Sequence, residues 1–308
     1  MNVSKKMAYA MMAVAAVLWG TSGPIAELAY EEGADSMQVA VFASVFTAAI
    51  LLFAVALFDR KSLIVRRKDL VHFFVFSLVT GTFFTLAWYT CVERTSTATA
   101  VILLYMYPSI VTIASIFTLG EKLDKAKVIA LPLTFIGCVL VAGARDLEEG
   151  GLAFDMLGIG LGVFAAFAAA LYYIWGKKFL DSYSANTVVL YLMMLSLPGL
   201  LVIANPIDLA DTSLSATAWA LIFMLGLVPG TIAFVVSLVA LNRIEASRAS
   251  IIASVEPVAA VILAYLLLSD TLNIWQTAGV GMVFVGVILL RLTQEKEPTK
   301  PVEAVLER

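Results

Sequence analysis

Apolar and polar positions alternate along this chain in long blocks. Ten apolar stretches, each almost free of charged residues, are separated by short polar gaps. Most of these stretches reach the ~17 to 25 residues that an α-helix needs to cross a bilayer. The pattern therefore predicts an all-α integral membrane protein with ten transmembrane helices. The ten stretches are residues 7–30, 37–58, 70–92, 97–119, 127–144, 154–176, 187–204, 216–241, 247–268 and 273–291.

The distribution of basic residues predicts the orientation of these helices. Of the 20 Lys and Arg residues, all but Arg94 and Arg145 fall in alternate gaps or at the chain ends, on one side of the membrane. The opposite gaps are rich in acids, among them Glu31, Glu32 and Asp35. Short basic loops resist translocation. We therefore expect a multi-pass protein of the cytoplasmic membrane of a bacterium, with both termini in the cytoplasm.

Composition narrows the choice of function. The chain is 61% hydrophobic and 14% charged, with a mean hydropathy of +0.96, which leaves no room for a soluble domain. Cys91 and Cys138 lie inside apolar stretches, so neither a disulfide nor a metal site is expected. We expect no cofactor, no catalytic residue and no nucleic-acid partner. The partners are the lipid bilayer and a small-molecule substrate, and the protein is either a monomer or a homodimer.

An internal repeat organises the chain. A shift of 149 positions, the separation of Pro108 from Pro257, superposes residues 74–137 on residues 223–286 without a gap. Each copy holds five spans, and an odd number of spans forces the second copy to enter the membrane upside down. We predict two inverted repeats, residues 1–145 and 152–292, followed by a disordered cytoplasmic tail at 293–308. Identical pairs include Gly81/Gly230, Arg94/Arg243, Pro108/Pro257, Phe135/Phe284 and Gly137/Gly286.

Short motifs mark the chain. Leu18-Trp19-Gly20 lies in the first span, and two further motifs occur in matching order in the two halves: Tyr107-Pro108 and Leu119-Gly120-Glu121-Lys122-Leu123 in the first, Glu256-Pro257 and Leu268-Ser269-Asp270-Thr271-Leu272 in the second. With them the chain resembles, over essentially its whole length, the EamA-type members of the drug/metabolite transporter superfamily. The resemblance implies a ten-span carrier of small metabolites, often an exporter of amino acids. Two features depart from the family pattern. Glu27 stands where many relatives carry a basic residue, and Ser269-Asp270 replaces the more usual Gly-Glu.

Matching breaks near the span centres are candidate gating positions. Pro108 and Pro257 fall near the middle of their spans, as do Gly81 and Gly230. A mid-helix proline bends the helix and frees a carbonyl, which hydrocarbon tolerates only beside protein or a wet cavity. Inverted repeats place a binding site near the membrane midplane. We predict that these four residues allow the helices to break or to gate, the alternative being simple packing kinks.

One carboxylate and several aromatic rings form the predicted substrate site. Glu256 is the acid nearest the centre of a span, where a charge is costly unless it meets a partner. Trp19 also lies at mid-depth, and Tyr105, Tyr107 and Tyr172 can add aromatic walls. Such a site suits an ammonium-bearing ligand through charge pairing and cation–π contact. A structural role remains open for Glu256, which can brace the kink at Pro257.

These patterns favour secondary transport by alternating access. We expect export of an amino acid or a related amine. A proton-coupled carrier of organic cations or drugs is the alternative, and a channel is a further one. The candidate coupling ion is the proton, with Glu256 and Glu27 as the groups that carry it. Ser22 and the sole histidine, His72, lie at depths too different for a serine protease. No phosphate-binding loop for ATP is present in the sequence.

Overall fold

The computed structural model describes residues 3–149, 155–204, 214–267 and 273–293. Within these ranges every regular element is a helix, and ten spans are long and apolar enough to cross a membrane, as predicted. They are Lys5–Glu31, Ser36–Phe58, Arg67–Arg94, Ala98–Thr118, Lys125–Gly143, Met156–Phe179, Ala185–Val202, Ala216–Leu241, Ala246–Leu266 and Ile274–Leu292. The predicted tail and the Ser269-Asp270 pair lie outside the described residues. An even number of spans returns the chain to the side on which it began.

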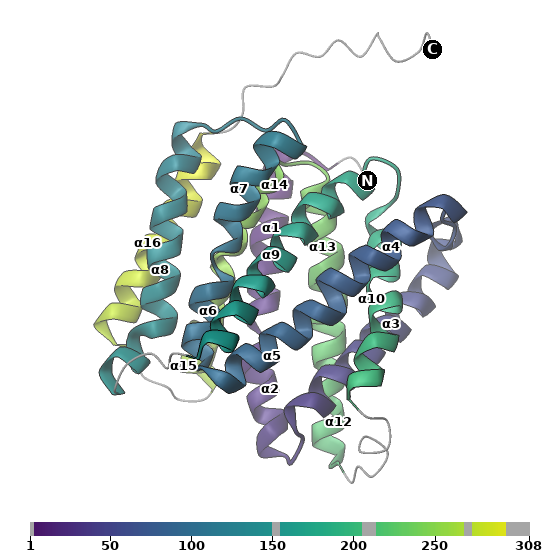
Figure 1. Cartoon of the computed structure of the whole chain (residues 1–308), viewed down its shortest axis with the longest axis horizontal. Helices are drawn as coiled ribbons and strands as arrows, with labels where there is room; N and C mark the ends of the chain where they lie inside the picture. Colours follow the sequence, from purple (N-terminus) through teal and green to yellow (C-terminus); the bar gives the residue numbers. More distant parts are fainter. Residues whose placement is uncertain (1–2, 150–154, 205–213, 268–272, 294–308) are drawn as a thin grey trace.

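Several spans consist of more than one helix (Figure 1). The first half contains α1 (Lys5–Gly20), α2 (Ser22–Glu31), α3 (Ser36–Phe58), η1 (Arg60–Leu63), η2 (Arg67–Asp69), α4 (Leu70–Ser77), η3 (Leu78–Phe83), α5 (Phe84–Arg94), α6 (Thr97–Leu104), α7 (Tyr107–Thr118) and α8 (Lys125–Glu149). The second half contains α9 (Met156–Phe179), α10 (Ala185–Ile203), α12 (Ala216–Leu225), η4 (Gly226–Ile232), α13 (Ala233–Leu241), α14 (Ala246–Ala253), α15 (Val255–Leu267) and α16 (Ile274–Leu292).

The interruptions follow the sequence repeat. The segments η3 and η4 are both π-helical, and the 149-residue shift superposes them. The break between α6 and α7, at Tyr105, corresponds in the same way to the break between α14 and α15, at Ser254. The first span breaks at Thr21, whereas the equivalent residue of the second half, Ala170, lies inside the continuous helix α9. The two halves therefore share their breaks except in the first span of each.

The prolines occupy a different place from the one expected of mid-helix kinks. Pro108 lies in the first turn of α7, and Pro257 lies in the first turn of α15. The first N–H groups of a helix have no partner within that helix, so a proline there removes no hydrogen bond. Each span has already broken before its proline is reached. The prolines thus begin new half-helices rather than bend continuous ones.

The two repeats interlock through their π-helical segments. Gly81 of η3 packs against Ser196 of α10, and Gly230 of η4 packs against Thr47 of α3. Ser196 and Thr47 are themselves equivalent by the 149-residue shift. A side chain on either glycine would overlap its neighbour, so these contacts need the bare backbone. The third span of each repeat therefore packs on the second span of the other.

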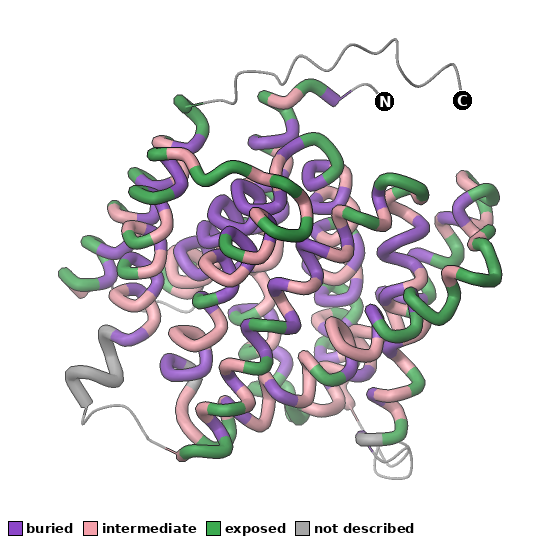
Figure 2. The backbone as a smooth tube through the Cα atoms, turned by 45° about the horizontal axis from the view of Figure 1, so that its top comes forward, coloured by how far each residue is buried: buried purple, intermediate pink, exposed green. Residues whose placement is uncertain are grey.

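The bundle is more closely packed at one end than at the other. Figure 2 shows buried positions gathered in the interior, with exposed positions along the rim. All eight residues of α14 are buried. In the equivalent helix α6, the positions from Val101 to Leu104 keep part of their surface accessible. We call the end that carries the start of α1 and the gap between α13 and α14 the basic end, and the opposite end the acidic end. The basic end is the closed one.

Candidate functional site

A chain of aromatic rings crosses the middle of the bundle. Trp19, at the end of α1, contacts Phe234 of α13 and Tyr172 of α9, with ring centroids 5.2 Å and 6.4 Å away. Tyr172 touches Tyr173 at 5.2 Å, and Tyr173 stacks in parallel on Tyr107 at 5.5 Å. The predicted Trp19, Tyr107 and Tyr172 therefore belong to one cluster built from four helices.

Tyr105 and Glu256 complete the cluster. The ring of Tyr105 lies 5.7 Å from that of Tyr107, and its hydroxyl hydrogen-bonds the carboxyl of Glu256. The side chain of Glu256 keeps part of its surface accessible, whereas its neighbours Val255 and Pro257 are buried. The structure thus brings all five predicted substrate-binding residues, Trp19, Tyr105, Tyr107, Tyr172 and Glu256, to the middle of the bundle.

A glycine contact holds the tryptophan and the glutamate in register. Gly20 follows Trp19, and a Cβ on Gly20 would lie 2.7 Å from the carbonyl oxygen of Glu256. No side chain fits at that separation, so only glycine allows the end of α1 to approach the start of α15 so closely. The break after α1 and the break before α15 therefore meet at one point.

Three half-helices begin at this point in the bundle. They are α2, α7 and α15, which start at Ser22, Tyr107 and Val255. The start of a helix carries partial positive charge from its aligned peptide dipoles. Half-helices that begin at mid-membrane attract anionic groups of substrates in transporters built from inverted repeats. The site consequently combines one carboxylate with a locally positive backbone.

Trp19 provides an additional polar group. Its indole Nε1 is buried and donates no hydrogen bond to any residue that the structure describes. Leaving such a donor unsatisfied costs about 1–3 kcal/mol. By contrast, the hydroxyl of Tyr172 pairs with Ser237 at 2.8 Å, and that of Tyr107 donates to the carbonyl of Ser250 at 3.4 Å. Trp19 is therefore the residue of the cluster with a donor still to be satisfied.

Some predicted residues lie elsewhere, and some cluster residues were not predicted. Glu27 is exposed on α2, and its role in proton coupling stays a prediction. Gly81 and Gly230 lie in the π-helical segments and contact other helices of the bundle. Phe234 was missed, because one phenylalanine among 18 in an apolar span carries no distinguishing signal. In the sequence, only its position next to Tyr172 distinguishes Tyr173 from other tyrosines.

A buried ionic cluster joins the two repeats at the basic end. Lys127, at the start of α8, pairs with Glu245 at 2.8 Å, and Glu245 also accepts from Arg248 Nε at 3.0 Å. Arg248 pairs in addition with Asp124 and donates to the carbonyl of Leu290 at 3.0 Å. Lys127 and Arg248 are each only 1% exposed. Buried charges require partners of this kind, because an unpaired charge there is strongly destabilising.

Glu121 extends the ionic cluster to the start of α14. Its carboxylate accepts hydrogen bonds from the backbone N–H groups of Ala246 at 2.6 Å and Ser247 at 3.1 Å, and from the hydroxyl of Ser247. A carboxylate at a helix N-terminus is favourable because it meets the positive end of the helix dipole. We refer to Glu121, Asp124, Lys127, Glu245 and Arg248 together as the inter-repeat cluster.

These features match a family of known transporters. The EamA-like transporter family matches residues 6–143 and again residues 156–292. The chain belongs to this family. The two matches place one EamA unit in each half, and the expected resemblance to the drug/metabolite transporters is confirmed. The protein is thus a membrane transporter of the EamA type.

Similar proteins extend over nearly the whole chain. The uncharacterized inner membrane transporter YicL of Salmonella typhimurium is 26% identical over 291 residues, which cover 92% of this chain and 94% of that protein. An uncharacterized transporter of Archaeoglobus fulgidus is 27% identical over 281 residues, covering 91% of this chain and 94% of its own length. A solved crystal structure superposes with a TM-score of 0.76 at 18% identity and covers 94% of this chain and 98% of its own. That likeness supports the fold alone.

Proposed function

We propose that this EamA transporter is a secondary active carrier that exports an amino acid or a closely related amine-bearing metabolite by alternating access. The observation that supports this substrate class most directly is that one cluster contains both the carboxyl of Glu256 and the unsatisfied N–H donor of Trp19. The carboxylate of Glu256 would bind the ammonium group of the substrate. The indole N–H of Trp19 and the starts of the half-helices would bind its carboxylate.

The aromatic cluster supports the cationic half of this proposal. Electron-rich ring faces attract an ammonium group, most strongly where water is excluded. Gly20, next to Trp19, packs against the carbonyl oxygen of Glu256, and the phenol of Tyr105 hydrogen-bonds the carboxyl of Glu256. A zwitterion thus meets a partner for each of its charges. An organic cation, which is the alternative substrate, would leave the N–H of Trp19 without a partner.

The unequal packing of the two ends supports alternating access with the basic end closed. The inter-repeat cluster and the fully buried helix α14 lie at that end. In α6, the counterpart of α14 at the acidic end, the positions from Val101 to Leu104 are more accessible. Exchange of the conformations of the two repeats would open the basic end and close the acidic end. We place the basic end and both termini in the cytoplasm, because short basic loops remain there.

Coupling to protons is part of the proposal. A carboxyl group at mid-membrane binds either a proton or a cationic substrate, and these two states exclude each other. Glu256 would release its proton when an ammonium group arrives and would regain it when the substrate leaves. The exposed Glu27 would deliver protons at the acidic end.

Transport in liposomes of purified protein tests the proposal. Counterflow of labelled amino acids should saturate and should exceed counterflow of a quaternary ammonium ion such as tetraethylammonium. Saturable exchange of the organic cation without amino acid exchange would replace the proposed substrate class with the alternative. Flux that neither saturates nor shows counterflow would indicate a channel.

A further inference from the structure

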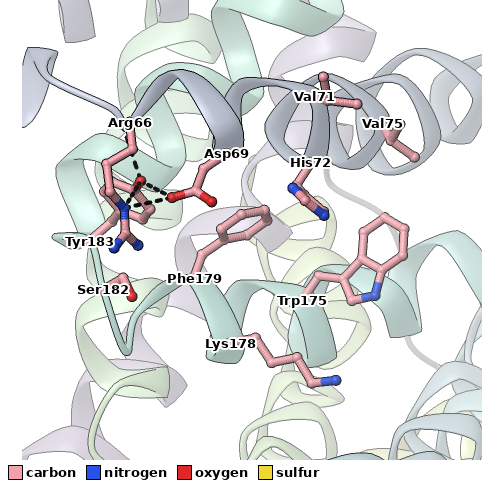
Figure 3. Close-up of a pocket in the computed structure, with 10 residues that line it drawn as sticks. All are labelled: Arg66, Asp69, Val71, His72, Val75, Trp175, Lys178, Phe179, Ser182 and Tyr183. Atoms are coloured by element: carbon pink, nitrogen blue, oxygen red, sulfur yellow. Dashed lines mark hydrogen bonds and ion pairs between the residues drawn. The ribbon is translucent and has the colours of Figure 1, made fainter.

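A pocket lies at the basic end of the bundle, apart from the aromatic cluster. Its volume is about 490 Å³, within the range of pockets that bind small ligands. The pocket lies between α4 on one side and the end of α9, with the turn that follows it, on the other (Figure 3). Helix α4 belongs to the first repeat and α9 to the second, so the pocket spans the boundary between them.

The polar wall of the pocket is predominantly basic. Arg66, His72 and Lys178 line it, against the single acid Asp69. Arg66 Nε pairs with Asp69 at 2.8 Å and also donates to the hydroxyl of Tyr183 at 3.2 Å. Within the described part of the chain, Lys178 and His72 form no ion pair or hydrogen bond, and both line the pocket. Figure 3 shows the imidazole of His72 directed into the gap between the helices, whereas the side chain of Lys178 extends along α9. The pocket therefore offers positive charge to a ligand.

The apolar wall is continuous with the membrane-facing surface. Val71 and Val75, which also line the pocket, are 67% and 41% exposed on the outer side of α4. The pocket lies where one span begins at Arg67 and another ends at Phe179. This is the depth of the lipid headgroups, and Trp175 beside it is of the type enriched at that interface. A ligand here would have its polar part at the headgroups and its apolar part in the bilayer.

A layer of aromatic side chains separates the pocket from the centre of the protein. Phe73 stacks on Phe179 with centroids 4.1 Å apart, and Phe76 lies 6.3 Å from Trp175. Phe73 and Phe76 are both fully buried. These rings fill the space between the pocket and the bundle interior, so the pocket opens outward and is not a branch of the substrate path.

We propose that this pocket binds the headgroup of an anionic phospholipid. The phosphodiester oxygens would accept hydrogen bonds from Lys178 and His72, and an acyl chain would lie along Val71 and Val75. Basic pockets between transmembrane helices bind anionic headgroups in this manner. Because α4 and α9 come from different repeats, a bound lipid stabilises their contact and with it the closed basic end.

Thermal unfolding of the purified protein in detergent tests this site. Phosphatidylglycerol should raise the unfolding temperature saturably, by about 5 °C or more, whereas phosphatidylcholine should not. The double variant His72→Gln and Lys178→Gln should lose this rise. Both side chains are exposed, so the variant should unfold like the parent in phosphatidylcholine. Lys61→Gln removes an exposed lysine at the same end that does not line the pocket, and it should keep the full rise.

Two results of the unfolding measurement would overturn the proposal. One is an undiminished effect of phosphatidylglycerol on the double variant. The other is an equal rise with inorganic phosphate or glycerol 3-phosphate at the same concentration, because the site would then bind a soluble phosphate. As a second readout, phosphatidylglycerol brominated on its acyl chains should quench the fluorescence of Trp175. The fluorescence of Trp175 is obtained as the difference between the parent and Trp175→Phe. If brominated lipid does not quench this fluorescence, the assignment is also contradicted.

Discussion

Lys127 of the first repeat and Glu245 of the second form an ion pair of 2.8 Å in which the lysine is almost completely buried. The 149-residue shift relates these residues to Gln276 and Ser96 at the acidic end, both uncharged. Gln276 caps α16, and Ser96 caps α6. The ion pair at the basic end therefore has no charged counterpart at the equivalent positions of the acidic end.

Removal of Lys127 should open the basic end. Lys127→Ala leaves Glu245, which is partly buried, with one partner fewer, and this destabilises the closed state. A loss of about 1.4 kcal/mol is a tenfold shift between states. We expect the reaction of a thiol reagent with Ser250→Cys, in the buried helix α14, to rise at least about tenfold. The measurement uses protein in which Cys91 and Cys138 are replaced by alanine.

Lys125→Ala is the matched control for Lys127→Ala. Lys125 is exposed, two residues away in the same helix, and its removal should leave the labelling of Ser250→Cys unchanged. Equal labelling in the parent and in Lys127→Ala would show that the ion pair does not hold this end closed.

Glu256→Gln should abolish net transport or make it independent of pH. The amide keeps the size of the side chain and can still bond the hydroxyl of Tyr105, but it has neither a charge nor a proton to release. Uptake into liposomes is measured across about pH 5 to 8, together with thermal stability. A variant with the parent's rate and pH profile would reduce Glu256 to a structural role beside Pro257.

Trp19→Phe should weaken the binding of zwitterionic substrates but not that of cationic ones. Phenylalanine keeps the aromatic contacts with Tyr172 and Phe234 but lacks the N–H donor. One lost hydrogen bond to a charged group corresponds to about 1.5–3 kcal/mol, so the KM for an amino acid should rise roughly tenfold or more. Inhibition by an organic amine without a carboxylate should change little. Trp219→Phe, far along the chain in α12, is the control, and an equal effect of both variants would contradict the role of the indole.

Asp59 should link stability to pH at the basic end. It accepts hydrogen bonds from Ser62 at 2.6 Å and from Asn186 at 3.0 Å, which hold its pKa below the usual range. A lowered folded-state pKa stabilises the fold above the unfolded value, ~3.9, and this stabilisation is lost as the pH falls through the folded value. Asp59→Ala should therefore unfold at a lower temperature than the parent at neutral pH. The difference should shrink in acid, and a difference independent of pH would exclude this linkage.

Cysteine labelling tests the orientation. Glu31 is exposed at the end of the first span, and Lys61 is exposed just after the end of the second span. Because consecutive spans cross the membrane in opposite directions, these two positions lie on opposite sides. In intact cells an impermeant thiol reagent should label Glu31→Cys and should reach Lys61→Cys only after the membrane is opened. The reverse pattern would invert the topology.

The spans and the repeat were predictable because they are properties of the linear chain. An apolar stretch must match the thickness of the bilayer wherever it lies, and a repeat is visible by aligning the chain with itself. The same reasoning predicted helix breaks at Pro108 and Pro257. The spans break just before these residues, at Tyr105 and Ser254, and each proline begins the next half-helix.

The sequence by itself determined the membrane fold, its two-fold internal relation, and which polar and aromatic residues lie near the middle of the spans. Only the tertiary structure decided which of them meet. Trp19 reaches Glu256 through the contact at Gly20, and Phe234 joins them from a span with no motif. Likewise, the sequence places Lys127 and Arg248 among the charges of polar loops. In the structure both are buried against acids of the opposite repeat. Contacts between distant helices depend on how their surfaces fit together, and hydropathy along the chain carries no record of that fit.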